Sequence, residues 1–292
     1  MASAAVAALA ADGLAPAGGV VAGPSAVEAP HPRLVAVVGD HPEPGAGSRR
    51  AAEAVGSAVV EVGAGDEAWI LLSGGTTSLI GAPIDGIEPG DLAGLYHWLL
   101  GSGLDIAAMN RVRKRFSRWG GGRLAAALAH ASVRCWVVSD VIGDDLAAIG
   151  SGPCVGDPTT AADIRALLAE AGLLEQIPAP LRQHLATVEG GRRPETPKPG
   201  DPAVERVEIA LIVSNRLALE AAARRATELG LAPEVMGAPI AGEAAAAGAS
   251  VAAMVLEKVV SSGGGQRGTP SRCTIWGGET TVTLGESPGV GG

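Results

Sequence analysis

Four apolar segments of the sequence each end in a group of small, hydroxyl, carboxylate or amide residues, the side chains that bind anions and metal ions. These groups are SGGTTS at 73–78, SDVIGDD at 139–145, SNR at 214–216 and GGETT at 277–281. If the apolar segments are parallel strands, their carboxyl ends lie where ligands of open α/β sheets bind. We therefore expect the first three groups to line one cleft. The alternative is that Ser, Asp and Asn only cap the following helices.

The group at 73–78 differs most from an ordinary turn. A surface turn needs one glycine or an Asn-Gly pair. Here Ser73 is followed by two glycines and then by Thr76, Thr77 and Ser78. Such a stretch brings backbone N–H groups and hydroxyls close to a ligand. We interpret it as a contact for an anionic group.

The region 105–123 is the densest basic cluster in an otherwise acidic chain, and it reads DIAAMNRVRKRFSRWGGGR. On a helix, Arg111, Lys114 and Arg118 can share one face, as can Asn110, Arg113 and Lys114. Arginine suits the binding of a carboxylate or phosphate because its guanidinium presents a planar fork of donors. The pattern therefore predicts an anion clamp, and the alternative is a solvated basic face.

The loop at 189–203, EGGRRPETPKPGDPA, contains four prolines and little capacity for regular structure. Loops of this length are usually functional or disordered. Because proline restricts the unfolded ensemble, the loop could be ordered and lie over the site. The alternative is a solvent-exposed linker between two halves of the chain.

Alternating apolar and helical patterns predict the elements that position these groups. Strands are expected at 19–21, 34–38, 68–72, 133–139, 209–213, 234–236, 272–276 and 280–284. Helices are expected at 2–10, 48–60, 89–100, 106–116, 122–129, 160–171, 180–185, 216–229 and 242–260. Strands separated by helices of this length indicate βαβ units. The predicted fold is α/β, with a Rossmann-like, mostly parallel sheet flanked by helices.

The composition agrees with this class and excludes others. Apolar residues make up 47% of the 292 residues but aromatics only 2%, so the core must be aliphatic, as in buried parallel strands. A net charge of −9 argues against a nucleic-acid groove. Three scattered cysteines indicate reduced thiols in the cytoplasm. The apolar segment 2–10 is too short for a membrane span and lacks the basic residues of a signal peptide.

Seven ordered motifs resemble those of the class II glycerate kinases, also called glycerate 2-kinases or the MOFRL-type family, whose members are often labelled hydroxypyruvate reductases. They are MNRVRKRFS, GGGRLA, SDVIGDDLAAIGSGP, DPTT, ETPKPGD, SNRLALEAA and GGETTVTL. The resemblance implies ATP-dependent phosphorylation of D-glycerate to 2-phosphoglycerate in a cleft between two α/β domains. It divides the chain into an N-terminal kinase domain at 1–262 and the start of a MOFRL domain at 263–292.

The resemblance also suggests roles for individual residues, because phosphoryl transfer depends on positioning and charge stabilisation. The catalytic candidates are Asp140, Asp144 and Lys114. Substrate binding is assigned to Asn110, Arg113, Arg123 and Lys198. Contacts to ATP are assigned to Ser73, Gly74, Gly75, Thr76, Thr77, Ser78, Asn215, Glu279 and Thr280. Mg²⁺, which takes one or two carboxylates together with phosphates, is assigned to Asp140 and Asp145. We expect a cytoplasmic enzyme, with a homodimer as one conceivable assembly.

The sequence departs from the family pattern at Thr76, where a glycine is commoner, and at three further places. A lysine that the family carries before its first helix falls at Met1, and Gly120 stands where another lysine is usual. The chain ends at Gly292, where family members continue. We therefore expect a fragment, folded in part, with little or no kinase activity.

Two other classes of function remain open from the sequence. The first is an oxidoreductase acting on hydroxypyruvate, although the segment GVVAGPSA at 19–26 is a poor match to a dinucleotide-binding GxGxxG. The second is a non-catalytic module that binds ligands without turnover.

Overall fold

The computed structural model describes residues 1–25, 28–261 and 271–282. The chain divides into two compact units, Met1–Ile212 and Val213–Gly292, and each is described by itself. The family boundary predicted at residue 262 adjoins a segment outside the described residues and stays a prediction.

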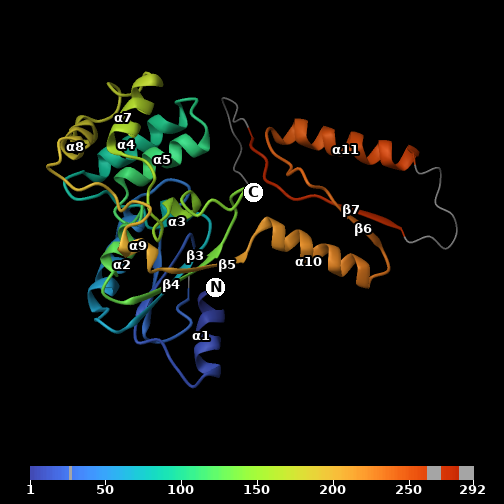
Figure 1. Cartoon of the computed structure of the whole chain (residues 1–292), viewed down its shortest axis with the longest axis horizontal. Coiled ribbons are helices and arrows are strands. Elements are labelled where there is room, and N and C mark those ends of the chain that lie inside the picture. The colour runs from blue at the N-terminus through green and yellow to red at the C-terminus, as the bar shows by residue number, and fades with distance from the viewer. Residues whose placement is uncertain (26–27, 262–270, 283–292) are drawn as a thin grey trace. The chain divides into compact units, whose positions relative to one another are not determined.

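Two pairs of strands in the first unit are parallel (Figure 1). Strand β1 (Gly19–Gly23) pairs with β2 (Leu34–Val38), so that Gly19 lies opposite Leu34. In a second sheet, β4 (Ser132–Val138) lies between β3 (Glu67–Leu72) and β5 (Glu208–Val213). Leu72 pairs with Val137, so β3 and β4 end side by side.

Along the chain, helices precede these strands and lie between them. They are α1 (Ala2–Ala11), α2 (Ala46–Glu61), α3 (Thr76–Leu79), α4 (Pro89–Leu100), α5 (Ile106–Phe116), α6 (Arg123–Ala127), the 3₁₀ turn η1 (Ile149–Ser151), α7 (Ala161–Glu170), α8 (Ala179–Glu189) and α9 (Pro202–Glu205).

The largest hydrophobic core lies among α4, α5, α7 and α8, which form a group of their own in Figure 1. Leu95, Leu99, Phe116 and Leu181 are fully buried there. Local sequence fixes the helix ends in this core. Thr160, for example, caps α7 by accepting the N–H of Asp163 (3.2 Å).

In the second unit, the parallel strands β6 (Ala232–Val235) and β7 (Arg272–Ile275) run between α10 (Asn215–Glu228) and α11 (Ala244–Ser261) (Figure 1). Isolated bridges from Ile240 to Gly278 and from Glu243 to Thr281 extend this pairing.

The predicted α/β class is confirmed, and the predicted strands up to 272–276 overlap observed strands. Three local predictions were wrong. Residues 280–282 form no strand but only the bridge at Thr281, and the rest of that predicted strand lies outside the described residues. The stretch expected as a turn at 73–78 contains α3, and α9 interrupts the predicted loop at 189–203. Among the helices in the described part of the chain, none has the length and apolar character to cross a membrane.

Candidate active site at the strand ends of the first unit

Three strand ends of the first unit meet around the turn that follows β3. The end of β2 reaches this turn because Gly39 lacks a side chain. A Cβ on Gly39 would lie 2.2 Å from the carbonyl oxygen of Leu79, the last residue of α3. The end of β4 reaches it through strand pairing.

The hydroxyl groups of the turn hold its own conformation. Thr76 Oγ1 donates to the carbonyl of Ser73 (2.7 Å), and Ser78 Oγ donates to the carbonyl of Gly75 (3.0 Å). Gly75 is the N-terminal cap residue of α3. Its φ of 76° lies in the left-handed region, which favours glycine. The N–H groups of Thr76 and Thr77 have no described acceptor. These donors remain for a ligand, whereas the hydroxyls of Thr76 and Ser78 are already used.

Two side chains from neighbouring strand ends lie against the two glycines of the turn. A Cβ on Gly74 would be 1.9 Å from Asp140 Oδ2, and a Cβ on Gly75 would be 3.1 Å from His41 Nε2. The double glycine therefore makes room for an acid and an imidazole. Asp140 is exposed, and its carboxylate accepts no hydrogen bond from the described residues.

The segment after β4 is folded tightly and contains two non-glycine residues with positive φ, Asp144 (55°) and Ser151 (66°). Asp145 Oδ1 accepts the N–H of Ala147 (2.9 Å), so one oxygen of this predicted metal ligand has an internal partner. Within the described residues, no group of three or more His, Cys, Asp or Glu is arranged to hold a metal ion.

Ser151 connects the turn after β3 with the glycine-rich turn before α6. Its hydroxyl forms a hydrogen bond of 2.9 Å with Thr77 Oγ1, and its carbonyl accepts the N–H of Gly121 (2.8 Å). Gly122 N–H donates to the next carbonyl, that of Gly152 (2.8 Å). The two glycine-rich stretches are thus fixed to each other through a serine that is 1% exposed.

The basic cluster on α5 is largely internal, so the solvated basic face is wrong for its centre. Lys114 Nζ lies 2.9 Å from Asp157 Oδ1, and both side chains are almost fully buried. Burial alone would raise the pKa of Asp157, but the hydrogen bond and charge of Lys114, together with two hydrogen bonds from Thr159, hold that pKa below its ordinary value. Arg115 is equally buried and pairs with Glu195 at 2.5 Å.

Arg123, predicted to contact substrate, is engaged with the backbone around it. Its Nη1 donates to the carbonyls of Lys114 (3.0 Å), Ser117 (3.1 Å) and Gly120 (3.2 Å), and its Nη2 donates to that of Arg115 (3.0 Å). Burial is the main reason why the pKa of Arg123 falls to about 10. These contacts close the end of α5 against the glycine-rich turn.

The proline-rich loop is anchored rather than free. Lys198 Nζ donates to the Thr159 carbonyl (2.5 Å), to Glu195 Oε2 (3.1 Å) and to Thr196 Oγ1 (2.9 Å). The carbonyl of Pro197 accepts the N–H of Asp157 (2.8 Å). The loop at 195–198 therefore covers the buried pairs of Lys114 and Arg115, and Lys198 has internal partners.

Arg113 is the predicted substrate cation with the fewest internal contacts. Its guanidinium lies 4.7 Å from the centre of the Tyr96 ring, and its Nε is buried without a hydrogen-bond partner. Burial lowers its pKa from the ordinary value. Asn110, half-buried one turn earlier on α5, has a side-chain amide that makes no hydrogen bond with the described residues.

The remaining predicted contacts belong to the second unit. Asn215 opens α10, and a Cβ on Gly277 would lie 2.1 Å from its Oδ1. The side chains of Glu279 and Thr280 are exposed. Ser214 caps α10 by accepting the N–H of Leu217 (3.3 Å), as the capping alternative expected.

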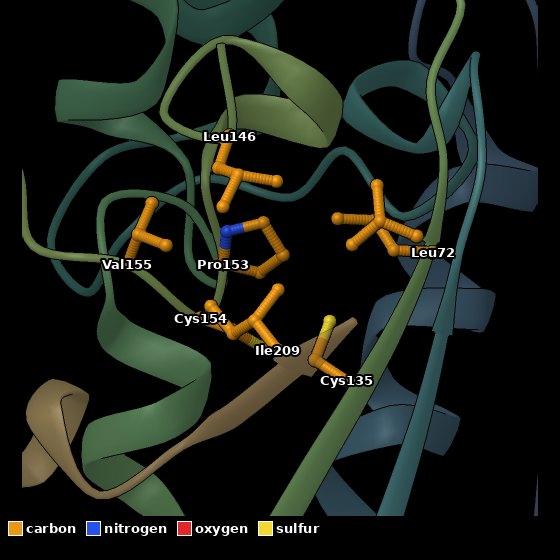
Figure 2. A pocket seen from close by; sticks show the side chains of 8 residues that line it. Leu72, Cys135, Leu146, Pro153, Cys154, Val155 and Ile209 are labelled. Carbon is orange, nitrogen blue, oxygen red and sulfur yellow. The ribbon is translucent and has the colours of Figure 1, made fainter. Parts of the chain in front are cut away.

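A small cavity of about 10 Å³ lies inside the first unit, beside Leu72 at the end of β3 (Figure 2). Its lining is apolar and includes Leu72, Leu146 and the thiols of Cys135 and Cys154. Hydrogen bonding to Cys135 and burial raise the pKa of the Cys154 thiol. Because the cavity has room for one water at most, it is a packing defect rather than a ligand site.

Sequence reasoning missed His41, Tyr96 and Ser151. His41 could have been found by the rule that selected the other groups, because GDHP at 39–42 follows a predicted strand directly. Ser151 lies within the motif SDVIGDDLAAIGSGP, but its contact with Thr77 spans 74 positions of the chain and could not be predicted. Tyr96 carries no such signal.

Residues 1–186 match the domain of unknown function DUF4147, and the chain belongs to this family. A protein of Agrobacterium vitis named as a hydroxypyruvate reductase is 38% identical over 259 residues, which are 88% of this chain and 56% of that protein. A glycerate 2-kinase of Pyrococcus horikoshii is 35% identical over 89% of this chain and 58% of its own length. The chain thus spans little more than half the length of these relatives.

The crystal structure of a glycerate kinase from Thermotoga maritima is similar in fold. It superposes with a TM-score of 0.81 at 30% identity and covers 100% of this chain and 66% of its own. The resemblance to class II glycerate kinases that the sequence motifs indicated is confirmed by these relatives.

Proposed function

We propose that this chain carries part of the active site of an ATP-dependent D-glycerate 2-kinase. The reaction transfers the γ-phosphoryl group of ATP to the 2-hydroxyl of D-glycerate. The observation that carries the proposal is the close approach of the Asp140 carboxylate to Gly74 in the turn between β3 and α3. The names of the Pyrococcus and Thermotoga relatives support the substrate.

Asp140 is the residue best suited to align the substrate hydroxyl. Its carboxylate is exposed and accepts no hydrogen bond from the described residues. It can therefore accept the proton of a bound hydroxyl. A carboxylate in this role orients the attacking oxygen in line with the leaving group. Asp144, four residues further on, is the alternative for the same role.

The same carboxylate fits Mg²⁺, which prefers oxygen ligands and often keeps only one or two from the protein. Asp145 would supply the second, through the oxygen that does not accept the N–H of Ala147. Bound together with ATP, the ion would neutralise part of the phosphate charge.

Arg113 is proposed to bind the carboxylate of D-glycerate, with Asn110 beside it on α5. Lys114, Arg123 and Lys198 already have internal partners, whereas Arg113 makes no ion pair with the described residues. Those three cations would then act by fixing α5 and the loop at 195–198. Contacts to ATP are proposed for Ser73–Ser78 and, in the second unit, for Asn215, Glu279 and Thr280.

The proposal is tested by measuring binding and turnover separately. Titration calorimetry with ATP–Mg²⁺ and with D-glycerate measures binding, and a coupled assay detects 2-phosphoglycerate. Asp140→Asn should weaken Mg²⁺-dependent nucleotide binding about 10- to 150-fold, as expected for a contact to a charged group. Asp12→Asn, an exposed site at the end of α1, should change nothing.

The proposal fails if the wild-type chain does not bind ATP–Mg²⁺, or if the two variants behave alike. A parallel assay of NADH oxidation with hydroxypyruvate tests the alternative hypothesis of an oxidoreductase directly. A cytoplasmic location and a homodimer are further proposals, and light scattering after size exclusion measures the assembly.

A further inference from the structure

His41 lies on the connection between β2 and α2, and hydrogen bonds fix the two residues that precede it. Gly39 N–H donates to the carbonyl of Gly23 (2.9 Å). Asp40 N–H donates to Ser48 Oγ (3.0 Å), while Ser48 N–H donates to Asp40 Oδ2 (3.1 Å). The imidazole therefore projects from an anchored position.

The imidazole lies over the same turn as Asp140. Its Cδ2 and Nε2 atoms would be 3.0 and 3.1 Å from a Cβ on Gly75, while Asp140 occupies the corresponding space at Gly74. The ring is exposed, and neither nitrogen makes a hydrogen bond with a described residue. Two strand ends thus place an acid and an imidazole over consecutive residues of one turn.

We propose that His41 donates a hydrogen bond to a phosphoryl oxygen of the nucleotide bound at this turn. The inference rests on the proposed function. An anion beside Gly75 needs hydrogen-bond donors, because taking a charged group out of water is costly unless the group is hydrogen-bonded. The N–H groups of Thr76 and Thr77 have no described acceptor, and His41 is the side-chain donor lying against Gly75. Hydrogen bonds to charged acceptors are stronger than neutral ones.

The proposal distinguishes a phosphoryl oxygen from the carboxylate of D-glycerate. We would titrate the 292-residue chain with ATP–Mg²⁺, with ADP–Mg²⁺ and with D-glycerate by calorimetry. His41→Ala should weaken both nucleotides about 10- to 150-fold and leave D-glycerate affinity within about twofold. His41→Gln, which keeps an N–H donor, should recover part of the nucleotide affinity. His97→Gln, at an exposed histidine of α4, is the matched control and should behave as wild type.

Each outcome decides the matter. Equal nucleotide affinity in His41→Ala and wild type overturns the inference and leaves the proposed function standing. Selective loss of D-glycerate binding also overturns it, because the imidazole would then serve the substrate carboxylate. If the wild-type chain binds D-glycerate but no nucleotide, the inference and the proposed kinase both fall. Circular dichroism should give the same melting temperature for all variants, since His41 is exposed.

Discussion

Replacing Ser151 by glycine and by alanine should separate its backbone strain from its hydrogen bond. Ser151 has a φ of 66°, and its hydroxyl is 2.9 Å from Thr77 Oγ1. Both variants lose this hydrogen bond, at about 0.5–1.5 kcal/mol. Only glycine relieves the left-handed conformation, which costs a non-glycine residue roughly 1–2 kcal/mol.

The glycine variant also gains freedom in the unfolded chain, which offsets about 0.4–1 kcal/mol of that relief. We therefore expect Ser151→Gly to be more stable than Ser151→Ala by about 0.5–1 kcal/mol and close to wild type. Nucleotide binding should nevertheless weaken in both, because the turn after β3 loses its connection to Gly121.

Urea denaturation followed by tryptophan fluorescence measures the difference, since four tryptophans (69, 98, 119 and 136) lie in the first unit. An alanine variant as stable as the glycine variant would refute the strain. Unchanged nucleotide affinity in both variants would refute the role of Ser151 in holding the turn.

Two further predictions concern buried charge. Lys114→Met should destabilise the first unit by about 3–5 kcal/mol, because Asp157 would stay buried without its partner; urea denaturation measures this, and adding Asp157→Leu should restore much of the loss. His184, 8% exposed and without hydrogen-bond partners, has a pKa lowered to about 4, mainly by burial and then by nearby arginines. The unfolded chain therefore binds a proton between about pH 6.5 and 4 that the folded chain does not. Stability should be complete above pH 6.5 and fall by up to about 3 kcal/mol as the pH drops to 4, and His184→Phe should flatten this dependence in denaturation curves recorded at each pH.

The strand ends of the first unit could be predicted from sequence because they depend on local pattern. Leu72 and Val138 end apolar runs, and the polar residues after them come together as parallel pairing requires. The partners of the basic cluster could not be predicted. Arg115 meets Glu195 across 80 positions of the chain, and no local signal announces such a contact.

The long sequence separation of these ion-pair partners also prevented a correct prediction of what the basic cluster does. A run of arginines and lysines is compatible with a solvated basic face or with an anion clamp until the acidic residues that face it are known. Two of its members, Lys114 and Arg115, proved to be internal. Arg113, which stacks on Tyr96, is the member of the cluster for which ligand binding stays a prediction.

The anchored proline-rich loop has a consequence for synthesis on the ribosome. Lys114 and Arg115 leave the exit tunnel long before Glu195 and Lys198, yet both cations are buried in the finished structure. Contacts that close a long stretch of chain form late, because the loop entropy must be overcome first. Until Glu195 has emerged, Arg115 on α5 therefore cannot be buried together with its partner. We expect the nascent first unit to stay open at the end of α5 until this contact has formed.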